Sequence, residues 1–299
     1  MTMTEQAPPR VTEPAVEVPG PRRRRRLSWP RLIPLVIAAM VFLFPFYYMI
    51  VGSLQKKENT SLSGVLPQPH NLTLHNYSQI NAALQLGKAL VNSGIFTGGV
   101  LLGTVVFGVL AGYALAQLHF RGRGLLFAVM LVLLMVPFQL LMIPLYVLVV
   151  RNYGLGDSYL GMIAPFAINS TAVFIFRQFF MQLPPELFDA ARIDGASERQ
   201  ILTRIAIPLV RPALITAMLL TFIGPWNEFL WPFLITKKQS LQPLAVALAN
   251  YMSTVSATAT NPFGAVLAGA FVLAFPAVLL IIVFGRYFVS PDIGSAVKG

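Results

Sequence analysis

The stretch from Leu32 to Leu54, LIPLVIAAMVFLFPFYYMIVGSL, decides the class of fold because it contains no charged residue. A helix rises about 1.5 Å per residue, so this stretch can cross the roughly 30 Å hydrocarbon core of a bilayer. The whole chain agrees: 56% of its 299 residues are hydrophobic, 11% are charged, and the mean hydropathy is +0.69. An ordinary soluble domain is about 25% charged. We therefore expect an all-α, polytopic membrane protein and not a soluble enzyme.

Five further apolar stretches follow the first, which predicts six transmembrane helices in a membrane domain of residues 32–285. The expected spans are 32–54, 89–118, 125–150, 160–180, 212–235 and 263–285. Pro137 and Pro144 interrupt the third span, which predicts a kink or an unwound turn there. The second span contains six glycines, which allow neighbouring helices to approach closely in lipid.

Residues 1–31 differ from the rest of the chain because they are polar, rich in proline and contain five consecutive arginines, Arg22 to Arg26. This composition predicts a disordered basic tail beside the membrane. A cleaved signal peptide is the alternative, since a basic run before an apolar stretch is how such a peptide begins. The apolar stretch is longer than a usual signal-peptide core and lacks a clear small-x-small cleavage site. A retained first helix is therefore favoured.

The basic residues predict the orientation in the membrane. With the two tails, the second connection and the fourth connection inside, 16 of the 22 Lys and Arg residues lie in the cytoplasm and six lie outside. The positive-inside rule then places both termini, including the tail 286–299, in the cytoplasm. The net charge of +11 could suggest nucleic acid, but the basic residues flank apolar spans. We expect them to meet anionic lipid and not nucleic acid.

Residues 182–211 are the long polar connection inside the membrane domain, and the local pattern predicts a hairpin of two short helices. Pro184 and Pro185 can open the first helix, and Gly195 can end it in a left-handed conformation. Ser197 and Gln200 have the spacing of a capping box, which predicts a second helix. We expect this second helix to run to about residue 207, before the next proline.

The first helix of this hairpin carries apolar residues that we expect to be exposed and to need a docking partner. They are Leu187, Phe188, Ala190, Ala191 and Ile193. A helix lying on the membrane surface is the alternative, and the basic residues would suit it. The hairpin also carries four acidic residues, which an anionic leaflet disfavours. Docking to a partner protein is therefore the favoured interpretation.

The spacing in this segment resembles the EAA loop of ABC-importer permeases, whose pattern is EAA, three residues, Gly, nine residues, I-x-L-P. Asp189-Ala190-Ala191, Gly195 and Ile205-Ala206-Ile207-Pro208 stand in that register, with Asp for Glu and Ile for Leu as the two departures. Other blocks resemble the carbohydrate-uptake family of these permeases, which includes the MalG subunit of the maltose transporter. They are Tyr113-Ala114-Leu115-Ala116, Phe120-Arg121-Gly122-Arg123, Ile143-Pro144-Leu145-Tyr146, 226–232 and 286–299. The resemblance covers roughly residues 32–299.

The resemblance implies a type I ABC-importer permease fold in the bacterial inner membrane, with a non-catalytic role in sugar import. It implies three kinds of protein partner: a second, MalF-like permease, two ATP-binding subunits and an extracytoplasmic sugar-binding protein. Membrane lipid is a further expected partner. ATP and Mg would be bound by the ATP-binding subunits, so this chain needs no cofactor. The sequence agrees, because it lacks the G-x-x-x-x-G-K-[ST] phosphate loop.

In this family the EAA loop docks into a groove of an ATP-binding subunit and couples ATP hydrolysis to transport. The coupling residues that the resemblance implies here are Glu186, Asp189, Ala190, Ala191, Asp194, Gly195, Ile205 and Pro208.

Polar groups inside the predicted spans are the candidates for the substrate pathway, because such groups are costly in lipid. Glu228 is the only acidic residue deep in a predicted span, and it lies between Trp226 and Trp231. It could line the cavity beside aromatic rings that stack on sugars, or make a contact between helices. The candidate set is Gln139, Asn169, Trp226, Asn227 and Glu228. In the maltose system the partner permease supplies most contacts to the sugar.

Other classes of protein have less support. The chain has no cysteine, and its three histidines fall in loops without ligand spacing, so neither thiolate chemistry nor a metal site is expected. A secondary, ion-coupled transporter is the main alternative, but it should show inverted repeats and several intramembrane acids. A channel should show a selectivity sequence or a charged ring. For an importer, a glycerol-phosphate-type polyol is the alternative to a disaccharide or oligosaccharide.

Overall fold

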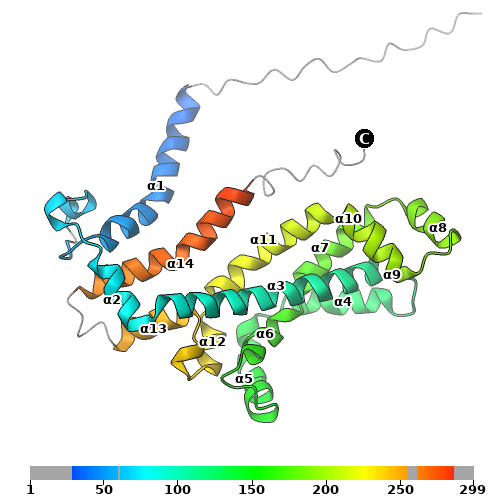
Figure 1. Cartoon of the computed structure of the whole chain (residues 1–299). Helices are drawn as coiled ribbons and strands as arrows, with labels where there is room; N and C mark the ends of the chain where they lie inside the picture. The colour runs from blue at the N-terminus through cyan, green and yellow to red at the C-terminus, as the bar shows by residue number, and fades with distance from the viewer. Residues whose placement is uncertain (1–28, 60, 255–260, 286–299) are drawn as a thin grey trace, which may run out of the picture. The chain divides into compact units, whose positions relative to one another are not determined.

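The computed structural model describes residues 29–59, 61–254 and 261–285, and the regular elements in these ranges are all helical (Figure 1). The helices longer than eight residues are α1 (Trp29–Ser53), α2 (His75–Leu84), α3 (Leu86–Gln117), α4 (Arg123–Leu134), α5 (Phe138–Tyr146), α6 (Tyr159–Ala167), α7 (Ser170–Met181), α8 (Pro185–Ile193), α11 (Arg211–Asn227), α13 (Leu244–Thr254) and α14 (Pro262–Phe284). The shorter ones are α9 (Glu198–Gln200), α10 (Ile207–Leu209) and α12 (Leu230–Ile235), with π-helical turns at Val147–Asn152 and Ile201–Ala206 and 3₁₀ turns at Leu62–Val65, Pro69–Asn71 and Gln239–Leu241.

The chain divides into two compact units, residues 1–45 and 46–299, and the contacts discussed below lie within the second unit. The described part of the first unit is the N-terminal portion of α1. Most of the predicted basic tail, residues 1–28, and all of the C-terminal tail, residues 286–299, lie outside the described residues.

The described helices provide up to six candidate membrane spans, which agrees with the predicted fold class. Three single helices are long and apolar enough to cross a bilayer, namely Leu32–Ser53 within α1, α3 and α14. Three further candidates are bent pairs: Arg123–Leu134 with Phe138–Asn152 at 96°, Tyr159–Ala167 with Ser170–Met181 at 44°, and Glu198–Leu209 with Leu214–Asn227 at 80°.

The expected third span is broken at the predicted proline. Pro137 has an extended ψ of 130° and separates α4 from α5, since it lacks a backbone N–H and disfavours helix in the residue before it. Pro144, by contrast, lies inside α5 without ending it. The proline nearer the middle of the apolar stretch therefore makes the bend.

Two further features differ from the expected spans. The fifth stretch does not form one helix, because Glu228 adopts an extended backbone (φ −65°, ψ 123°) and divides α11 from α12. Helices α2 and α13 lie in stretches expected to be loops. Both are too short to cross a bilayer, so a search for long hydrophobic stretches does not find them.

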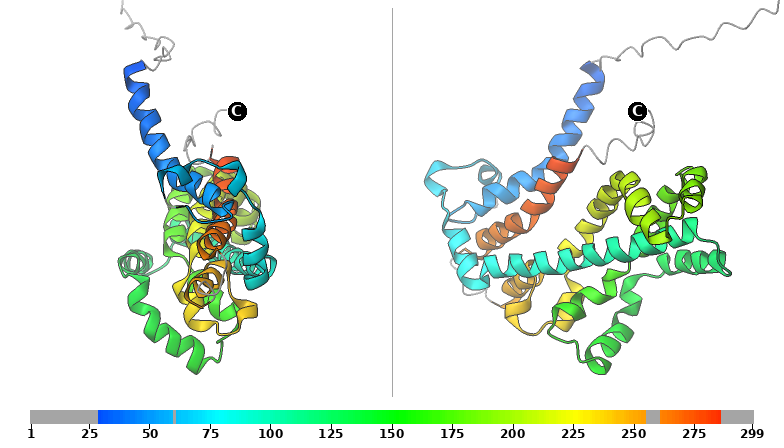
Figure 2. Two further views of the ribbon diagram at one scale, coloured as in Figure 1. Left: turned by 90° about the vertical axis from the view of Figure 1, so that its left-hand side faces the viewer. Right: turned by 45° about the vertical axis from the view of Figure 1, so that its right-hand side comes forward.

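Helix α3 is the central element of the second unit, and α6, α7 and α11 pack along it (Figures 1 and 2). Its glycines bring the neighbours close. A Cβ atom at Gly103 would lie 2.7 Å from the Cβ of Ala167 in α6, and one at Gly112 would lie 2.7 Å from the Cβ of Phe176 in α7. Real Cβ atoms do not approach so closely, so these contacts need glycine, as predicted for helices packed in lipid.

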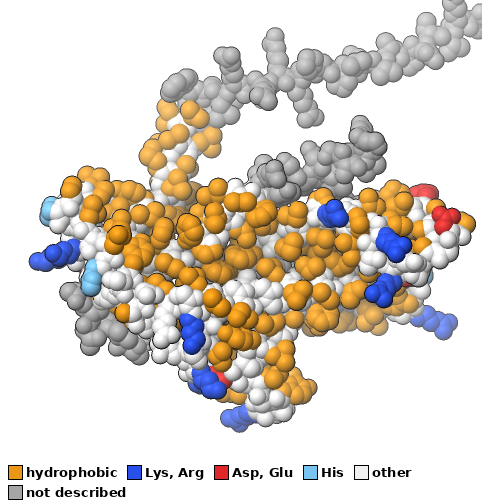
Figure 3. Space-filling view, in the orientation of Figure 1, with side chains coloured by type: hydrophobic (Ala, Val, Ile, Leu, Met, Phe, Trp, Pro, Cys, Tyr) orange, Lys and Arg blue, Asp and Glu red, His pale blue; other side chains and the backbone are white. Residues whose placement is uncertain are grey.

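Three buried clusters hold the unit together. One joins α3, α7 and the segment after α7; a second joins α2, α13, α14 and the start of α3; a third joins α3, α6 and α12. Hydrophobic side chains also cover much of the face seen in Figure 3, with charged groups toward its ends. In a membrane protein, such an apolar surface faces lipid or another subunit.

Candidate functional site

The segment Pro185–Leu209, here the hairpin, folds as its local sequence predicts. Pro184 and Pro185 open α8, with Glu186 in the first turn, and Gly195 has the left-handed φ of +81° that favours glycine after the helix end. The capping box is present in both directions: the Ser197 N–H donates to Gln200 Oε1 at 2.8 Å, and the Gln200 N–H donates to Ser197 Oγ at 3.4 Å. Short-range sequence signals therefore define both helix ends.

The second helix of the hairpin is longer than expected. It continues from α9 through the π-helical turn Ile201–Ala206 into α10, which ends at Leu209 and not near residue 207. Pro208 lies in the last turn of this helix, shortly after the π-helical turn ends.

The apolar face of α8 is only partly exposed, so the expectation that Phe188 and Ala191 are exposed is wrong. Phe188 is fully buried and Ala191 is 9% exposed, in the cluster that joins the hairpin to α3 and α7. The ring centroid of Phe188 lies 6.4 Å from that of Tyr113 in α3. Leu187, Ala190 and Ile193 remain exposed, with Ile193 at 86%. The hairpin therefore has one face packed on its own chain and one exposed face.

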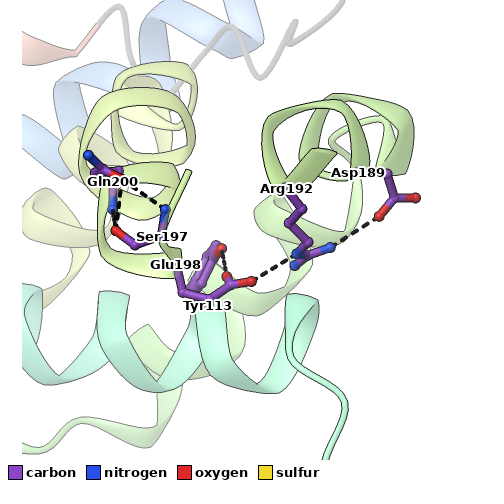
Figure 4. A network of polar contacts seen from close by, with 6 residues as sticks. All are labelled: Tyr113, Asp189, Arg192, Ser197, Glu198 and Gln200. Atoms are coloured by element: carbon purple, nitrogen blue, oxygen red, sulfur yellow. Dashed lines mark hydrogen bonds and ion pairs between the residues drawn. The ribbon is translucent and has the colours of Figure 1, made fainter. Parts of the chain in front are cut away.

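A polar network fixes the hairpin to the end of α3 (Figure 4). The Tyr113 hydroxyl donates to Glu198 Oε2 at 2.6 Å, and Arg192 Nε donates to Glu198 Oε1 at 2.8 Å. Arg192 also donates through Nη1 to Asp189 Oδ1 at 3.1 Å. Glu198 thus joins α3, α8 and α9 through one carboxylate.

The hydrogen bond between Arg192 and Glu198 favours the charged form of both side chains. The hydrogen bond from Arg192 lowers the pKa of Glu198, against the opposing effect of partial burial. The same bond raises the pKa of Arg192. Both groups are therefore ionised at neutral pH. Asp189 keeps a side chain that is 68% exposed, so it can also meet a partner.

The residues expected to couple to the ATPase fall into two groups. Glu186, Asp189, Ala190, Asp194 and Gly195 are exposed. Ala191 is buried and Ile205 is half-buried, and both pack in the cluster that holds the hairpin on its own chain. Pro208 is half-buried. A shallow hollow of about 250 Å³ lies where the two helices meet. Its lining includes Asp194, Gly195, Gln200, Arg204 and Ile205.

Three members of the network, Tyr113, Arg192 and Glu198, were not identified from the sequence. Tyr113 and Glu198 are 85 positions apart, and no periodicity or motif connects residues at that separation. The resemblance did include the block that begins at Tyr113, but it gave that tyrosine no role.

The candidates for the substrate pathway near the end of α11 make contacts within the chain. Trp226 is buried and donates through Nε1 to the carbonyl of Leu273 in α14 at 2.8 Å, so it makes a contact between helices. Asn227 is exposed and donates to the carbonyl of Ile223 at 3.0 Å. Glu228 is half-buried, and its Oε1 accepts from the Trp231 N–H at 3.1 Å, in the first turn of α12.

The other two pathway candidates lie on different helices. Asn169 caps α7, where its Oδ1 accepts from the Ala172 N–H at 3.2 Å. Gln139 lies exposed in the first turn of α5, directly after the break at Pro137. Among the described residues, no group of three or more His, Asp or Glu side chains could hold a metal ion.

Comparison with a solved structure defines the fold first. The fold matches a chain described as "Crystal structure of a bacterial ABC transporter involved in the import of the acidic polysaccharide alginate", with a TM-score of 0.76 and 24% identity. The match covers 87% of this chain and 95% of that chain. The fold is therefore that of a subunit of an ABC importer.

Sequence comparison then defines the family. Residues 104–289 match the family described as "Binding-protein-dependent transport system inner membrane component", and the chain belongs to this family. It is 33% identical over 276 residues to the arabinooligosaccharides transport system permease protein AraQ of Halalkalibacterium halodurans, covering 91% of this chain and 97% of AraQ. It is 32% identical over 265 residues to the sn-glycerol-3-phosphate transport system permease protein UgpE of Yersinia pestis, covering 86% and 92%.

Membership in this family confirms several predictions from the sequence. The protein is a multi-pass permease component of an ABC transporter in the inner membrane, and it is not catalytic. ATP is handled by partner subunits, and a binding protein belongs to the complex. The alternative of an ion-coupled secondary transporter does not apply to this family.

Proposed function

We propose that this chain forms half of the translocation pathway of an oligosaccharide importer and couples that pathway to ATP hydrolysis through the hairpin. The observation that carries this proposal is the attachment of the hairpin to α3. Phe188 is buried against Tyr113, and the Tyr113 hydroxyl binds Glu198 at 2.6 Å. A force applied to the hairpin is therefore passed to the helix that packs against α6, α7 and α11.

The exposed face of the hairpin is the proposed contact with the ATP-binding subunit. It offers Leu187 and Ile193 as apolar groups and Glu186, Asp189 and Asp194 as acids. A mixed face of this kind suits a groove that has apolar walls and basic residues at its rim. ATP-driven closure of two ATP-binding subunits would then move the hairpin and switch the helix bundle between two arrangements.

The proposed complex contains a second, homologous permease, two ATP-binding subunits and an extracytoplasmic sugar-binding protein. The orientation that fits it places the hairpin and both termini in the cytoplasm. Arg121, Arg123, Arg177 and the four arginines of residues 181–211 support this orientation through the positive-inside rule.

An oligosaccharide is the proposed substrate because the relative AraQ is named for arabinooligosaccharide transport and matches over 91% of this chain. A glycerol phosphate is the second candidate, since the relative UgpE is named for sn-glycerol-3-phosphate transport. The purified binding protein of the same transporter distinguishes the two. We expect arabinose-type or other oligosaccharides to raise its melting temperature, and a rise with sn-glycerol-3-phosphate alone would favour the second candidate.

The coupling role can be tested with Gly195→Trp and Asp189→Lys in the purified, reconstituted complex. A tryptophan at Gly195 must adopt a φ of +81° that residues with a Cβ disfavour, so the turn of the hairpin should distort. Asp189→Lys reverses a charge on the proposed contact face and breaks the pair with Arg192. We expect insertion to persist while transport and binding-protein-stimulated ATPase activity fall at least about tenfold, a loss of ~1.4 kcal/mol.

Matched controls lie on other connections. Gly154→Trp also places a tryptophan at a left-handed glycine, with φ +64° and open space around the Cβ position. Glu58→Lys reverses an exposed acidic charge in the connection after α1. We expect both controls to keep coupled ATPase activity. Normal transport and ATPase stimulation in the two hairpin variants would show that the hairpin does not couple.

A further inference from the structure

Three arginines gather where the end of α3, the start of α4 and the second half of α7 meet. Arg121 and Arg123 flank Gly122, the left-handed residue directly before α4, and Arg177 lies on α7. The guanidinium carbon of Arg177 is 3.9 Å from the centroid of the Phe127 ring. Phe127 is one turn beyond Arg123 on α4, so Arg123 and Arg177 lie close to each other.

Two of these arginines also bind the end of α3. Arg177 Nε donates to the carbonyl of Leu115 at 3.3 Å, and Arg123 Nη1 donates to the carbonyl of Leu118 at 3.0 Å. These bonds hold the guanidinium groups at fixed places, because the last carbonyls of a helix are free to accept hydrogen bonds. Each bond uses one of the five N–H donors of an arginine.

The cluster contains no acid to balance its charge. In the described part of the chain, the two ion pairs both involve Arg192 of the hairpin, and neither involves Arg121, Arg123 or Arg177. Guanidinium groups held side by side repel each other, and a phosphate can bind several of them through paired hydrogen bonds. The cluster therefore has the chemistry of an anion site.

The residues beside the cluster are exposed and apolar, which favours a lipid over a soluble ion as the ligand. Leu125, Leu126 and Val129 follow Arg123 on α4 and are 70%, 56% and 49% exposed. An apolar strip that begins at a cationic cluster fits the acyl chains and the headgroup of one phospholipid. The cluster also lies at the hairpin end of α3, where Gln117 Nε2 donates to the carbonyl of Phe180 at 2.7 Å. On the proposed orientation, this end faces the anionic cytoplasmic leaflet.

We propose that Arg121, Arg123 and Arg177 bind the phosphate of an anionic phospholipid whose acyl chains lie along α4. This site goes beyond the proposed transport function, since it concerns the lipid that holds the junction of α3, α4 and α7. A free phosphate shares the headgroup chemistry, and the experiment below separates the two sources.

The test uses the purified transporter complex in nanodiscs of phosphatidylcholine with or without phosphatidylglycerol, followed by native mass spectrometry of the lipid retained after release. Each arginine near an anionic surface contributes about a fivefold change in binding. We therefore expect Arg123→Gln/Arg177→Gln to retain phosphatidylglycerol about thirtyfold less well than the unaltered complex. Arg151→Gln, an exposed arginine in the connection before α6, should retain it unchanged.

Arg121→Gln tests the site apart from the end of α3, because Arg121 is exposed and does not share the bonds to the Leu115 and Leu118 carbonyls. We expect it to weaken retention of phosphatidylglycerol about fivefold with no change in subunit composition. Three results would overturn the proposal. In the first, the double variant retains as much phosphatidylglycerol as the unaltered complex. In the second, millimolar inorganic phosphate displaces the lipid. In the third, the variant complex has lost a partner subunit, and that loss explains the missing lipid.

Discussion

The two ends of α3 are anchored by different kinds of polar contact. At the hairpin end, Tyr113 meets the ionised pair of Glu198 and Arg192, and these two side chains are 43% and 34% exposed. At the opposite end, Asn92 is 2% exposed and donates through Nδ2 to the carbonyls of Ser240 and Gln242, both at 3.0 Å. Its Oδ1 accepts from the Tyr159 hydroxyl at 2.6 Å.

This difference shows how one helix can be both fixed and adjustable. Neutral bonds from a buried side chain have little water to replace them, so breaking one leaves a polar group without its partner. Exposed ion pairs exchange with water and are screened by salt, and a typical one stabilises by at most about 1 kcal/mol. We infer that α3 is held firmly near Asn92 and can move at the hairpin end. That arrangement suits a helix driven from the hairpin.

The largest expected effect is at the firm end. Asn92→Ala removes three hydrogen bonds and leaves two carbonyls and the Tyr159 hydroxyl without their partner. We expect the free energy of unfolding to fall by about 3 kcal/mol, since each of the three hydrogen bonds that are lost contributes ~1 kcal/mol. Denaturant titration of the detergent-solubilised protein measures this. Asn227→Ala, at an exposed asparagine with one bond within its own helix, should cost under about 0.5 kcal/mol. Equal losses of unfolding free energy in the two variants would show that Asn92 does not hold its end of α3 more firmly than an exposed asparagine would.

A smaller effect is expected at the hairpin end, where Tyr113→Phe, Glu198→Ala and the double variant form a cycle. The two side chains share a hydrogen bond of 2.6 Å, so their losses should not add. We expect a coupling energy of about 1 kcal/mol at low salt, measured from unfolding of the three variants. In 1 M salt the effect of Glu198→Ala should shrink because its pair with Arg192 is screened. Additive losses at both salt concentrations would show that the network does not join the hairpin to α3.

The smallest effect concerns acid and Asp157, in the connection before α6. Its carboxylate accepts from the backbone N–H groups of Lys237 and Lys238 at 2.6 and 2.8 Å, and these bonds hold its pKa below its usual value. A lowered pKa in the folded state means that the stabilisation is present above the unfolded pKa of about 3.9 and is lost as the pH falls through the folded value.

The measurement is the melting temperature of the wild type and Asp157→Asn between pH 7 and pH 3. At pH 7 the variant should be less stable by under about 1 kcal/mol, because exposed charges are screened. The two curves should approach each other toward pH 3. Curves that stay parallel would show that Asp157 contributes nothing through its charge.

The sequence was sufficient to predict features set by local chemistry. Hydropathy found the apolar stretches, and Gly195, Ser197 and Gln200 defined the turn of the hairpin, because caps and left-handed turns depend on a few neighbouring residues. The burial of Phe188 and Ala191 could not be predicted from the sequence. An amphipathic pattern shows that a face is apolar, but it does not show whether its own chain or a partner covers that face.

Contacts between segments far apart in the chain also could not be predicted from the sequence. Tyr113 and Glu198 meet because α7 returns the chain to the end of α3, and this depends on the close approach at Gly112. The break at Glu228 was missed for a different reason. The apolar residues on both sides of it are those of one span, and the backbone conformation of a single residue divides them.

The 96° bend between α4 and α5 bears on how a cell must make this protein. Helix α4 has 12 residues and rises about 18 Å, so it cannot cross the roughly 30 Å of hydrocarbon alone. The backbone at the bend needs water or another polypeptide for its hydrogen bonds. Met135, Leu140 and Ile143 around it are 82%, 71% and 79% exposed. A subunit made in excess would hold this corner against lipid with backbone groups unpaired, so matched synthesis of the subunits shortens the time that the bend spends without a partner.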